Sequence, residues 1–279
     1  MSEKTKTPVT KKIAGILRAV AGTPDPKNFT SVVVCAAGSS TRMEALMGET
    51  RKQFLELDGM PVVARTLKAF EAADTIHEII VVAREDEISL YDNFKETYGL
   101  TKLTKVVKGG ATRQESARLG SDEVDERCRF VAVADAARCL ITPEEIQKVC
   151  HAAYQWNAAS AGIKATDTVK VCDSSAFIDS TPDRDYVWMA QTPQVFALNL
   201  YRAAAYVARD EDFKATDDNQ MLEHIRVPVK MVACSRENIK ITEPSDVIFA
   251  TAILNARKKA AETAAETAAE TVQPAEGAQ

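Results

Sequence analysis

A chain of 279 residues, 46% hydrophobic and 27% charged, is long enough for one sizeable core with appendages. Its formal net charge of −5 argues against nucleic acid and anionic membranes as partners, because both select basic surfaces. Any phosphate-binding site is therefore expected to be local. No apolar run approaches the roughly 18 residues that span a bilayer, so no membrane partner is expected either.

Both ends of the chain differ from its middle. Residues 1–28 combine lysines with apolar residues at helical spacing and contain the breaker TPDP, which predicts a basic amphipathic appendage and a linker. From Ala260 to Thr271 the sequence Ala-Ala-Glu-Thr is repeated three times, which favours a helix but offers no apolar face. We expect residues 257–279 to form a tail that is either a fraying helix or, because it has no apolar face to bury, disordered. Residues 29–256 remain as the globular domain.

The six cysteines form no CxxC pair and no Cys/His cluster at zinc spacing. They are typical of reduced, mostly structural thiols, so a cytoplasmic location is expected. The basic N-terminus leaves an organellar presequence as the alternative.

The middle of the chain alternates short β-branched runs with amphipathic segments. The runs predict buried parallel strands, and the segments predict crossover helices, because their apolar residues recur at three- and four-residue spacing. The expected strands are 32–35, 79–82, 105–107 and 130–133, and the expected helices are 61–73, 112–124 and 143–156. The last helix opens with a capping box and a proline. The fold class is α/β, an open, doubly wound, Rossmann-like sheet that is mostly parallel.

Residues 167–185 interrupt this alternation with polar, turn-rich sequence and short extended pieces. They do not fit a further βα unit. We expect a protruding β-arm at about 165–187 that reaches a partner subunit.

Ligands of such sheets bind beyond the carboxyl ends of the strands, so the turns after the strands are the candidate sites. The first turn, 36–43 (AAGSSTRM), is followed by 51–54 (RKQF). Small residues let a nucleotide approach the backbone, and exposed amides with Arg42 and Lys52 would hold a triphosphate. The turn matches neither a Walker P-loop nor GxGxxG, and taken alone it could equally be an ordinary turn with surface cations.

Two further turns carry candidate groups. In 109–116 (GGATRQES), paired glycines permit close backbone approach and the helix start offers amides, so a base could lie there. In 134–138 (ADAAR), Asp135 ends a strand, where Mg²⁺ bridging phosphates would find a hard oxygen ligand. Taken alone, Asp135 could equally be a helix cap.

Together these segments resemble one family, the 2-C-methyl-D-erythritol 4-phosphate cytidylyltransferases of the non-mevalonate isoprenoid pathway. The resemblance covers about residues 30–254. The three turns are similar to the family's AAGxGxRM with PKQ, GGxxRxxS and HDAARP. The family's DTxK, R…LWxAQTPQ, TDE/TDD and NIKxTxPxD resemble 167–170, 183–194, 216–218 and 238–244. Seven matches in the same order argue against chance.

The resemblance implies that a phosphate oxygen of the acceptor attacks the α-phosphorus of CTP in line and expels pyrophosphate, with Mg²⁺ or another divalent cation as cofactor. It implies catalytic roles for Arg42, Lys52 and Lys240, which would stabilise charge on the α-phosphate and the leaving group. It also implies a fold of the nucleotidyltransferase type and a homodimer.

The remaining implied roles are binding roles. The residues matching the family's nucleotide-binding positions are Ala36, Ala37, Gly38, Gly110, Ser116, Asp135 and Ala136, with Asp135 as metal ligand. Those matching its acceptor-binding positions are Arg138, Thr168, Arg184 and Asp217. Thr168 and Arg184 lie on the expected arm and would complete the neighbouring subunit's site. Singly, Arg184 could be an exposed arginine, Lys240 a solvated lysine and Asp217 a helix cap.

The chain departs from the family's motifs at four positions. Ser40, Arg51, Ala134 and Cys139 stand where the family has glycine, proline, histidine and proline. Arg51 would either add a phosphate contact or loosen the loop that proline fixes. Attack by a phosphate oxygen needs no general base, so we expect activity to survive, with a lower rate as the alternative.

Two other functions stay open. Ribitol 5-phosphate cytidylyltransferases share several of these segments, although Trp188 with Ala190 and residues 216–218 favour methylerythritol phosphate. A catalytically impaired nucleotide-binding homologue would account for the changes at 51, 134 and 139, but the retained charged residues count against it. A dinucleotide-dependent oxidoreductase is disfavoured, because the fingerprint glycines are missing.

Overall fold

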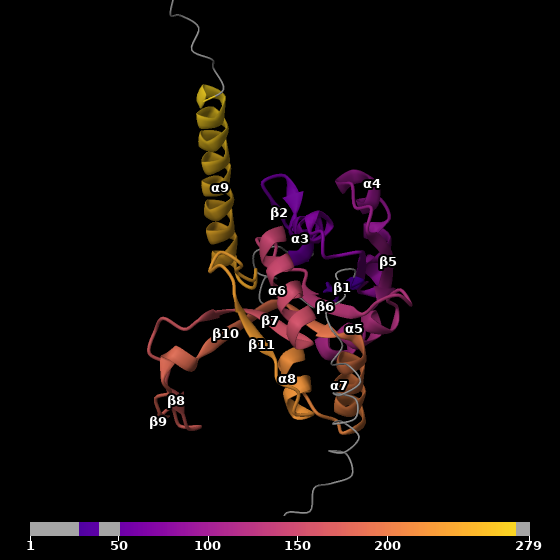
Figure 1. Cartoon of the computed structure of the whole chain (residues 1–279), viewed down its shortest axis with the longest axis vertical. Helices are drawn as coiled ribbons and strands as arrows, with labels where there is room; N and C mark the ends of the chain where they lie inside the picture. Colours follow the sequence, from indigo (N-terminus) through magenta and orange to yellow (C-terminus); the bar gives the residue numbers. More distant parts are fainter. Residues whose placement is uncertain (1–27, 39–50, 272–279) are drawn as a thin grey trace, which may run out of the picture.

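The computed structural model describes residues 28–38 and 51–271. Its centre is a seven-stranded sheet in the order β11-β7-β10-β6-β1-β4-β5 (Figure 1). The strands are β1 (Thr30–Cys35), β4 (Glu78–Ala83), β5 (Leu103–Lys108), β6 (Phe130–Asp135), β7 (Ala158–Lys164), β10 (Trp188–Ala197) and β11 (Lys230–Ala233). Only β10 in this sheet runs antiparallel to its neighbours, β6 and β7. The predicted doubly wound, mostly parallel sheet is confirmed, and the four expected strands lie within β1, β4, β5 and β6.

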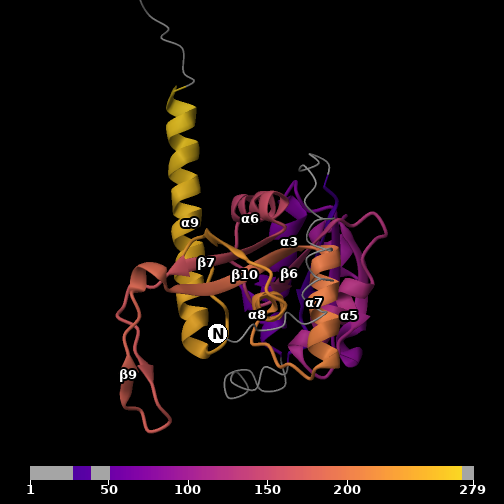
Figure 2. The ribbon, with the colours of Figure 1, turned by 60° about the horizontal axis from the view of Figure 1, so that its bottom comes forward.

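Helices cover both faces of the sheet, and β4 and β6 are therefore buried along their whole length. Helices α3 (Val62–Ala72) and α6 (Pro143–Trp156) pack against each other on one face. Helices α5 (Arg113–Asp122) and α7 (Leu198–Asp210) lie side by side on the other (Figure 2). Gly120 permits close approach of α5, since a side chain there would collide with Val33 of β1.

Several shorter elements connect these strands and helices. They are the 3-10 helices η2 (Lys52–Phe54), η3 (Glu85–Tyr91) and η4 (Arg184–Tyr186), the helices α4 (Phe94–Tyr98) and α8 (Asp218–His224), and the hairpin strands β2 (Glu56–Leu57) and β3 (Met60–Pro61). The expected capping box of α6 is present: the Thr142 hydroxyl accepts from the Glu145 amide at 3.3 Å, and the Glu145 carboxylate accepts from the Thr142 amide at 3.2 Å. It fixes where α6 begins.

The expected arm projects from the ends of β7 and β10 as a hairpin of β8 (Val171–Cys172) and β9 (Ile178–Ser180) (Figures 1 and 2). Its side chains are exposed, and they include the large apolar residues Phe177 and Ile178, exposed by 74% and 62%. An extended hairpin with an apolar surface has no core of its own to stabilise it.

The C-terminal helix α9 (Pro244–Thr271) stands out as a long rod in Figure 1. Its first turns pack Val247 and Ala250 into a second apolar cluster with Leu57. Residues 257–271 continue this helix, which corrects the expectation of a disordered tail over that range. Ion pairs at the exit, Arg257 with Glu237 at 2.8 Å and Lys258 with Asp58 at 2.5 Å, support the continuation, and alanine has the highest helix propensity.

The predicted N-terminal appendage, except for Asn28, and residues 272–279 of the tail lie outside the described residues. Of the helices that are described, none combines the length and apolarity needed to cross a membrane.

Candidate active site

The carboxyl ends of β1, β5 and β6 open into a cavity of about 530 Å³. In the sheet register Cys35 lies opposite Asp135, so the turns after β1 and β6 start at the same level. All seven predicted nucleotide-binding residues line the cavity, together with Lys240. The sheet topology therefore brings together residues that are up to 204 positions apart in the chain.

The turn after β5 forms one wall and leaves no room for larger side chains. A Cβ atom at Gly109 would lie 2.7 Å from the Ala37 Cβ and 2.9 Å from the Ser116 hydroxyl. The Ser116 hydroxyl accepts from the Gly110 amide at 3.1 Å, and the Glu115 carboxylate accepts from the Ala111 amide at 2.8 Å. The amides of Gly110 and Ala111 are thus used to fix the turn itself.

Asp135 is buried at the end of β6 and is surrounded by cations. Arg113 Nε lies 2.9 Å from its Oδ1, and Lys240 Nζ lies 2.8 Å from its Oδ2. Arg138 Nε lies 3.7 Å from Oδ2. Burial alone would raise the pKa of Asp135, but the three cations outweigh it and hold the pKa well below its usual range. The carboxylate therefore stays ionised, and the cations around it exceed its single charge.

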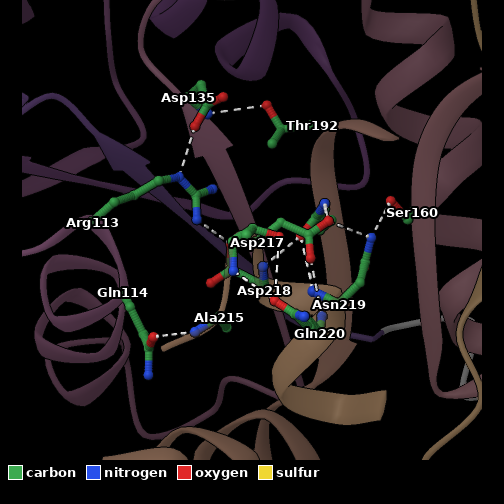
Figure 3. A network of polar contacts seen from close by, with 12 residues as sticks. Arg113, Gln114, Asp135, Ser160, Thr192, Ala215, Asp217, Asp218, Asn219 and Gln220 are labelled. Atoms are coloured by element: carbon green, nitrogen blue, oxygen red, sulfur yellow. Dashed lines mark hydrogen bonds and ion pairs between the residues drawn. The ribbon is translucent and has the colours of Figure 1, made fainter. Parts of the chain in front are cut away.

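Arg113 connects Asp135 to helix α8, as Figure 3 shows. Its Nη1 lies 2.7 Å from Oδ2 of the buried Asp218, whose Oδ1 accepts from the Tyr201 hydroxyl at 3.1 Å. Burial would lower the pKa of Arg113, but the carboxylates of Asp218 and Asp135 raise it. Arg113 lies within the motif 109–116, but the motif alone does not indicate this bridging role. The available signal was the pair of aspartates at 217 and 218.

Asp217 lies at the start of α8 and caps that helix. Its carboxylate accepts from the Gln220 amide at 3.0 Å, from the Gln194 side chain at 2.8 Å and from the Asn219 side chain at 3.0 Å (Figure 3). It is not among the residues that line the cavity. In the single chain, Asp217 therefore acts as a helix cap, which was the alternative interpretation of this residue.

Lys240 is held in place by the turn after β6. Arg138 donates to the Asn238 carbonyl at 2.7 Å, and the Ile241 amide donates to the Ala137 carbonyl at 2.8 Å. Asn238 is buried and donates to Thr192, whose hydroxyl accepts from the Asp135 amide at 3.0 Å. Arg138, expected to bind the acceptor, thus also joins two walls of the site.

Thr168 and Arg184 are exposed on the arm and do not line the cavity of their own chain. Arg184 donates to the Thr166 carbonyl at 3.2 Å, within the arm. Arg42 lies outside the described residues, and for Lys52 the structure describes the backbone, which begins η2.

The family model for 2-C-methyl-D-erythritol 4-phosphate cytidylyltransferase matches residues 30–256. The chain belongs to this family. The enzyme of that name from Caldanaerobacter subterraneus is 42% identical over 225 residues, which cover 80% of this chain and 98% of the relative. The one from Alkaliphilus oremlandii is 37% identical and covers 82% and 97%. A solved structure of 4-diphosphocytidyl-2C-methyl-D-erythritol synthase from Anaerococcus prevotii is 33% identical, with a TM-score of 0.74 over 82% of this chain and 96% of that one.

Three of the four departures from the family's motifs fall on described residues. Ala134 and Cys139 are buried, Ala134 in the main core and Cys139 in the cluster beneath α9. Arg51 pairs with Glu87, Nε to Oε1 at 3.2 Å. Ser40 lies outside the described residues. The described substitutions are thus accommodated by packing or by an ion pair.

No group of three or more His, Cys, Asp or Glu side chains in 28–38 and 51–271 could hold a metal ion. Asp135 is the carboxylate that lines the cavity there. A metal at this place would take further ligands from a bound nucleotide and from water, the usual arrangement for Mg²⁺ with phosphates.

Proposed function

We propose that this protein transfers the cytidylyl group of CTP to 2-C-methyl-D-erythritol 4-phosphate and releases pyrophosphate. The observation that carries the proposal is the cavity in which Arg113 and Lys240 flank Asp135, with Arg138 as a third cation beside that carboxylate, within a chain of this family. An excess of positive charge in a buried, shaped site is what a triphosphate requires.

The turn of 109–116 would form the wall for the cytosine base, because Gly110 and Ser116 line the cavity opposite the small residues after β1. The small residues 36–38 let the ribose and phosphates approach the opposite wall. The triphosphate would then lie beside Lys240, with Arg42 and Lys52 as the further cations. Each would stabilise negative charge that moves onto the α-phosphate and the leaving pyrophosphate.

Asp135 is the residue that would hold Mg²⁺ or a similar divalent cation. Its oxygens already face three cations, so the phosphates of CTP are needed to make the site favourable for a metal, and we expect metal and nucleotide to bind together. The metal would neutralise the triphosphate and polarise the α-phosphate.

The acceptor would be bound between two subunits of a homodimer. Thr168 and Arg184 lie on an arm that projects from its own domain and carries exposed apolar side chains. Burial of these side chains against a second copy would stabilise the arm and bring Arg184 to the acceptor's phosphate. We expect the reaction to take place in the cytoplasm.

A pyrophosphate-release assay tests the proposal, with purified protein, CTP and Mg²⁺ and with methylerythritol phosphate, ribitol 5-phosphate or no acceptor. Release with methylerythritol phosphate alone, lost in Lys52→Ala, is the expected result. Release with ribitol 5-phosphate instead would keep the chemistry and change the acceptor. CTP binding without release from any mixture would leave the impaired homologue as the function.

A further inference from the structure

The segment that carries Lys52 is fastened to η3 by a buried polar cluster. Gln53 Nε2 donates to the Ala36 carbonyl at 3.0 Å and to Glu87 Oε2 at 3.1 Å. The other carboxylate oxygen of Glu87, Oε1, lies 3.2 Å from Arg51 Nε. Gln53 and Glu87 are exposed by only 2% and 4%. One carboxylate therefore ties both neighbours of Lys52 to the rim of the cavity.

Apolar packing supports the same attachment. The Phe54 ring lies 5.5 Å from the Tyr91 ring and 6.4 Å from the Phe94 ring, so η2 rests on the end of η3 and on α4. These aromatic contacts fix where η2 lies, but they do not fix its rotation. The hydrogen bonds of Gln53 supply that directional restraint, and the ion pair of Arg51 adds a charge contact to the same carboxylate.

The charge of Arg51 is needed by Glu87 itself. Burial raises the pKa of the Glu87 carboxyl by more than Arg51 and the hydrogen bond from Gln53 lower it, so the charged form depends on these two partners. A buried carboxylate without a partner is costly, and Arg51 offsets that cost. Arg51, which stands where the family's motif has proline, thus directs its guanidinium at Glu87, 36 positions away. The contact with η3 restrains the turn that a proline ring would otherwise stiffen.

We propose that Glu87 is a positioning residue: through Arg51 and Gln53 it fixes the backbone at Lys52 against the nucleotide turn at Ala36. The proposal rests on the proposed function in one respect, the role of Lys52 beside the phosphates. Since that role is exerted in the transition state, a displaced Lys52 lowers kcat more than it raises KM for CTP.

A double-mutant cycle tests the pair. Glu87→Gln keeps the size of the side chain and removes the charge, and Arg51→Met keeps much of the length and removes the guanidinium. Each single change is expected to lower kcat about tenfold with KM for CTP nearly unchanged, because small misplacements of a catalytic group are costly. The double variant is expected to be about as impaired as either single one, since it leaves no unpaired charge.

Hydrogen exchange in the peptide covering 51–57 gives a second measurement that needs no activity. Both single variants are expected to exchange faster there than the parent protein. Glu85→Gln is the matched control, because Glu85 lies on the same 3-10 helix, is exposed, and pairs with Lys108 at 2.5 Å. It should change neither kcat nor exchange.

Unchanged kcat and unchanged exchange in Glu87→Gln would overturn the proposal. A second result would also overturn it: a loss of kcat of about a hundredfold in the double variant, together with a raised KM for CTP in Arg51→Met. Arg51 would then contact phosphate independently of Glu87. If the parent protein releases no pyrophosphate at all, the proposed function fails, and the exchange measurement still decides the role of Glu87.

Discussion

Arg113 Nε lies 2.9 Å from Asp135 Oδ1, although Arg113 begins helix α5 and Asp135 ends strand β6. The contact joins the turn after β5 to the carboxylate at the end of β6. Through Asp218 the same guanidinium also reaches α8. A change at Arg113 should therefore affect both the stability of the domain and the shape of the site.

Replacing Arg113 by methionine should lower the free energy of unfolding by about 3 kcal/mol, because it leaves the buried carboxylate of Asp218 without its cation. Urea unfolding followed by circular dichroism would measure the loss. Lys105→Met is the control, since it removes an exposed pair with Glu123 and should leave the urea midpoint unchanged. Equal stability of the Arg113 variant and its parent would contradict the bridging role.

The pH dependence of stability should reveal Asp135. Burial opposes its ionisation, but Arg113, Lys240 and Arg138 hold its native pKa below the unfolded value of about 3.9. Its contribution is therefore complete above that value and is lost as the pH falls below it. The free energy of unfolding should be measured for the parent protein and for Asp135→Asn from about pH 6 down to about pH 3. The difference between the two should shrink below about pH 4. An advantage that is constant with pH would show that the charge of Asp135 is not what stabilises the fold.

The strands of the parallel half could be predicted, because their β-branched runs are local signals. Strand β7 could not: its sequence AASAGIK has little β propensity, and its place in the sheet follows from pairing with β10 and β11 on its two sides. The helix over 257–271 agrees with the helix propensity of the Ala-Ala-Glu-Thr repeat, but the sequence does not reveal the anchoring of Lys258 on Asp58.

The walls of the site could be predicted from motifs, but the contacts across it could not. Arg113 and Asp218 are 105 positions apart, and they come together through α7, which packs against both α5 and α8. The same holds for Arg51 and Glu87, which sit on separate segments and carry no shared pattern. Pairings of this kind depend on tertiary structure, which periodicity and spacing do not encode.

Lys240→Met should lower kcat/KM for the cytidylyl transfer by about a hundredfold, the usual cost of one preorganised cation or donor at developing charge. The structure places its ammonium 2.8 Å from Asp135 at the cavity wall. Pyrophosphate release under saturating and limiting CTP separates kcat from KM. The control is Lys230→Met, which removes an exposed cation on strand β11 and should leave both constants unchanged.

The thiol of Cys35 should be unreactive although it lines the cavity. Burial raises its pKa to about 12, so almost no thiolate exists near neutral pH. Iodoacetamide at about pH 8 should leave Cys35 unmodified in the native protein and modify it after unfolding in guanidinium, as read by peptide mass spectrometry. Cys35 is half-buried, so rapid native labelling would mean that its thiol ionises more readily than the raised pKa allows.

The shared site of the proposed dimer predicts complementation between two inactive variants. Lys240→Met damages the cavity, and Arg184→Met damages the arm that would reach the neighbouring cavity. In a mixed dimer one site then contains both lesions and the other contains none. Coexpressed subunits that pair at random should therefore recover about a quarter of the parent activity.

The control for this experiment is the pair Lys240→Met and Lys52→Ala, both of which belong to the nucleotide side of one chain. In their mixed dimers each site keeps one lesion, so activity should stay low. If the Lys240 and Arg184 variants also fail to complement while forming dimers, Arg184 would act on the cavity of its own chain. The arm would then have to fold back over its own domain. Something other than a second subunit would have to bury the exposed side chains of Phe177 and Ile178.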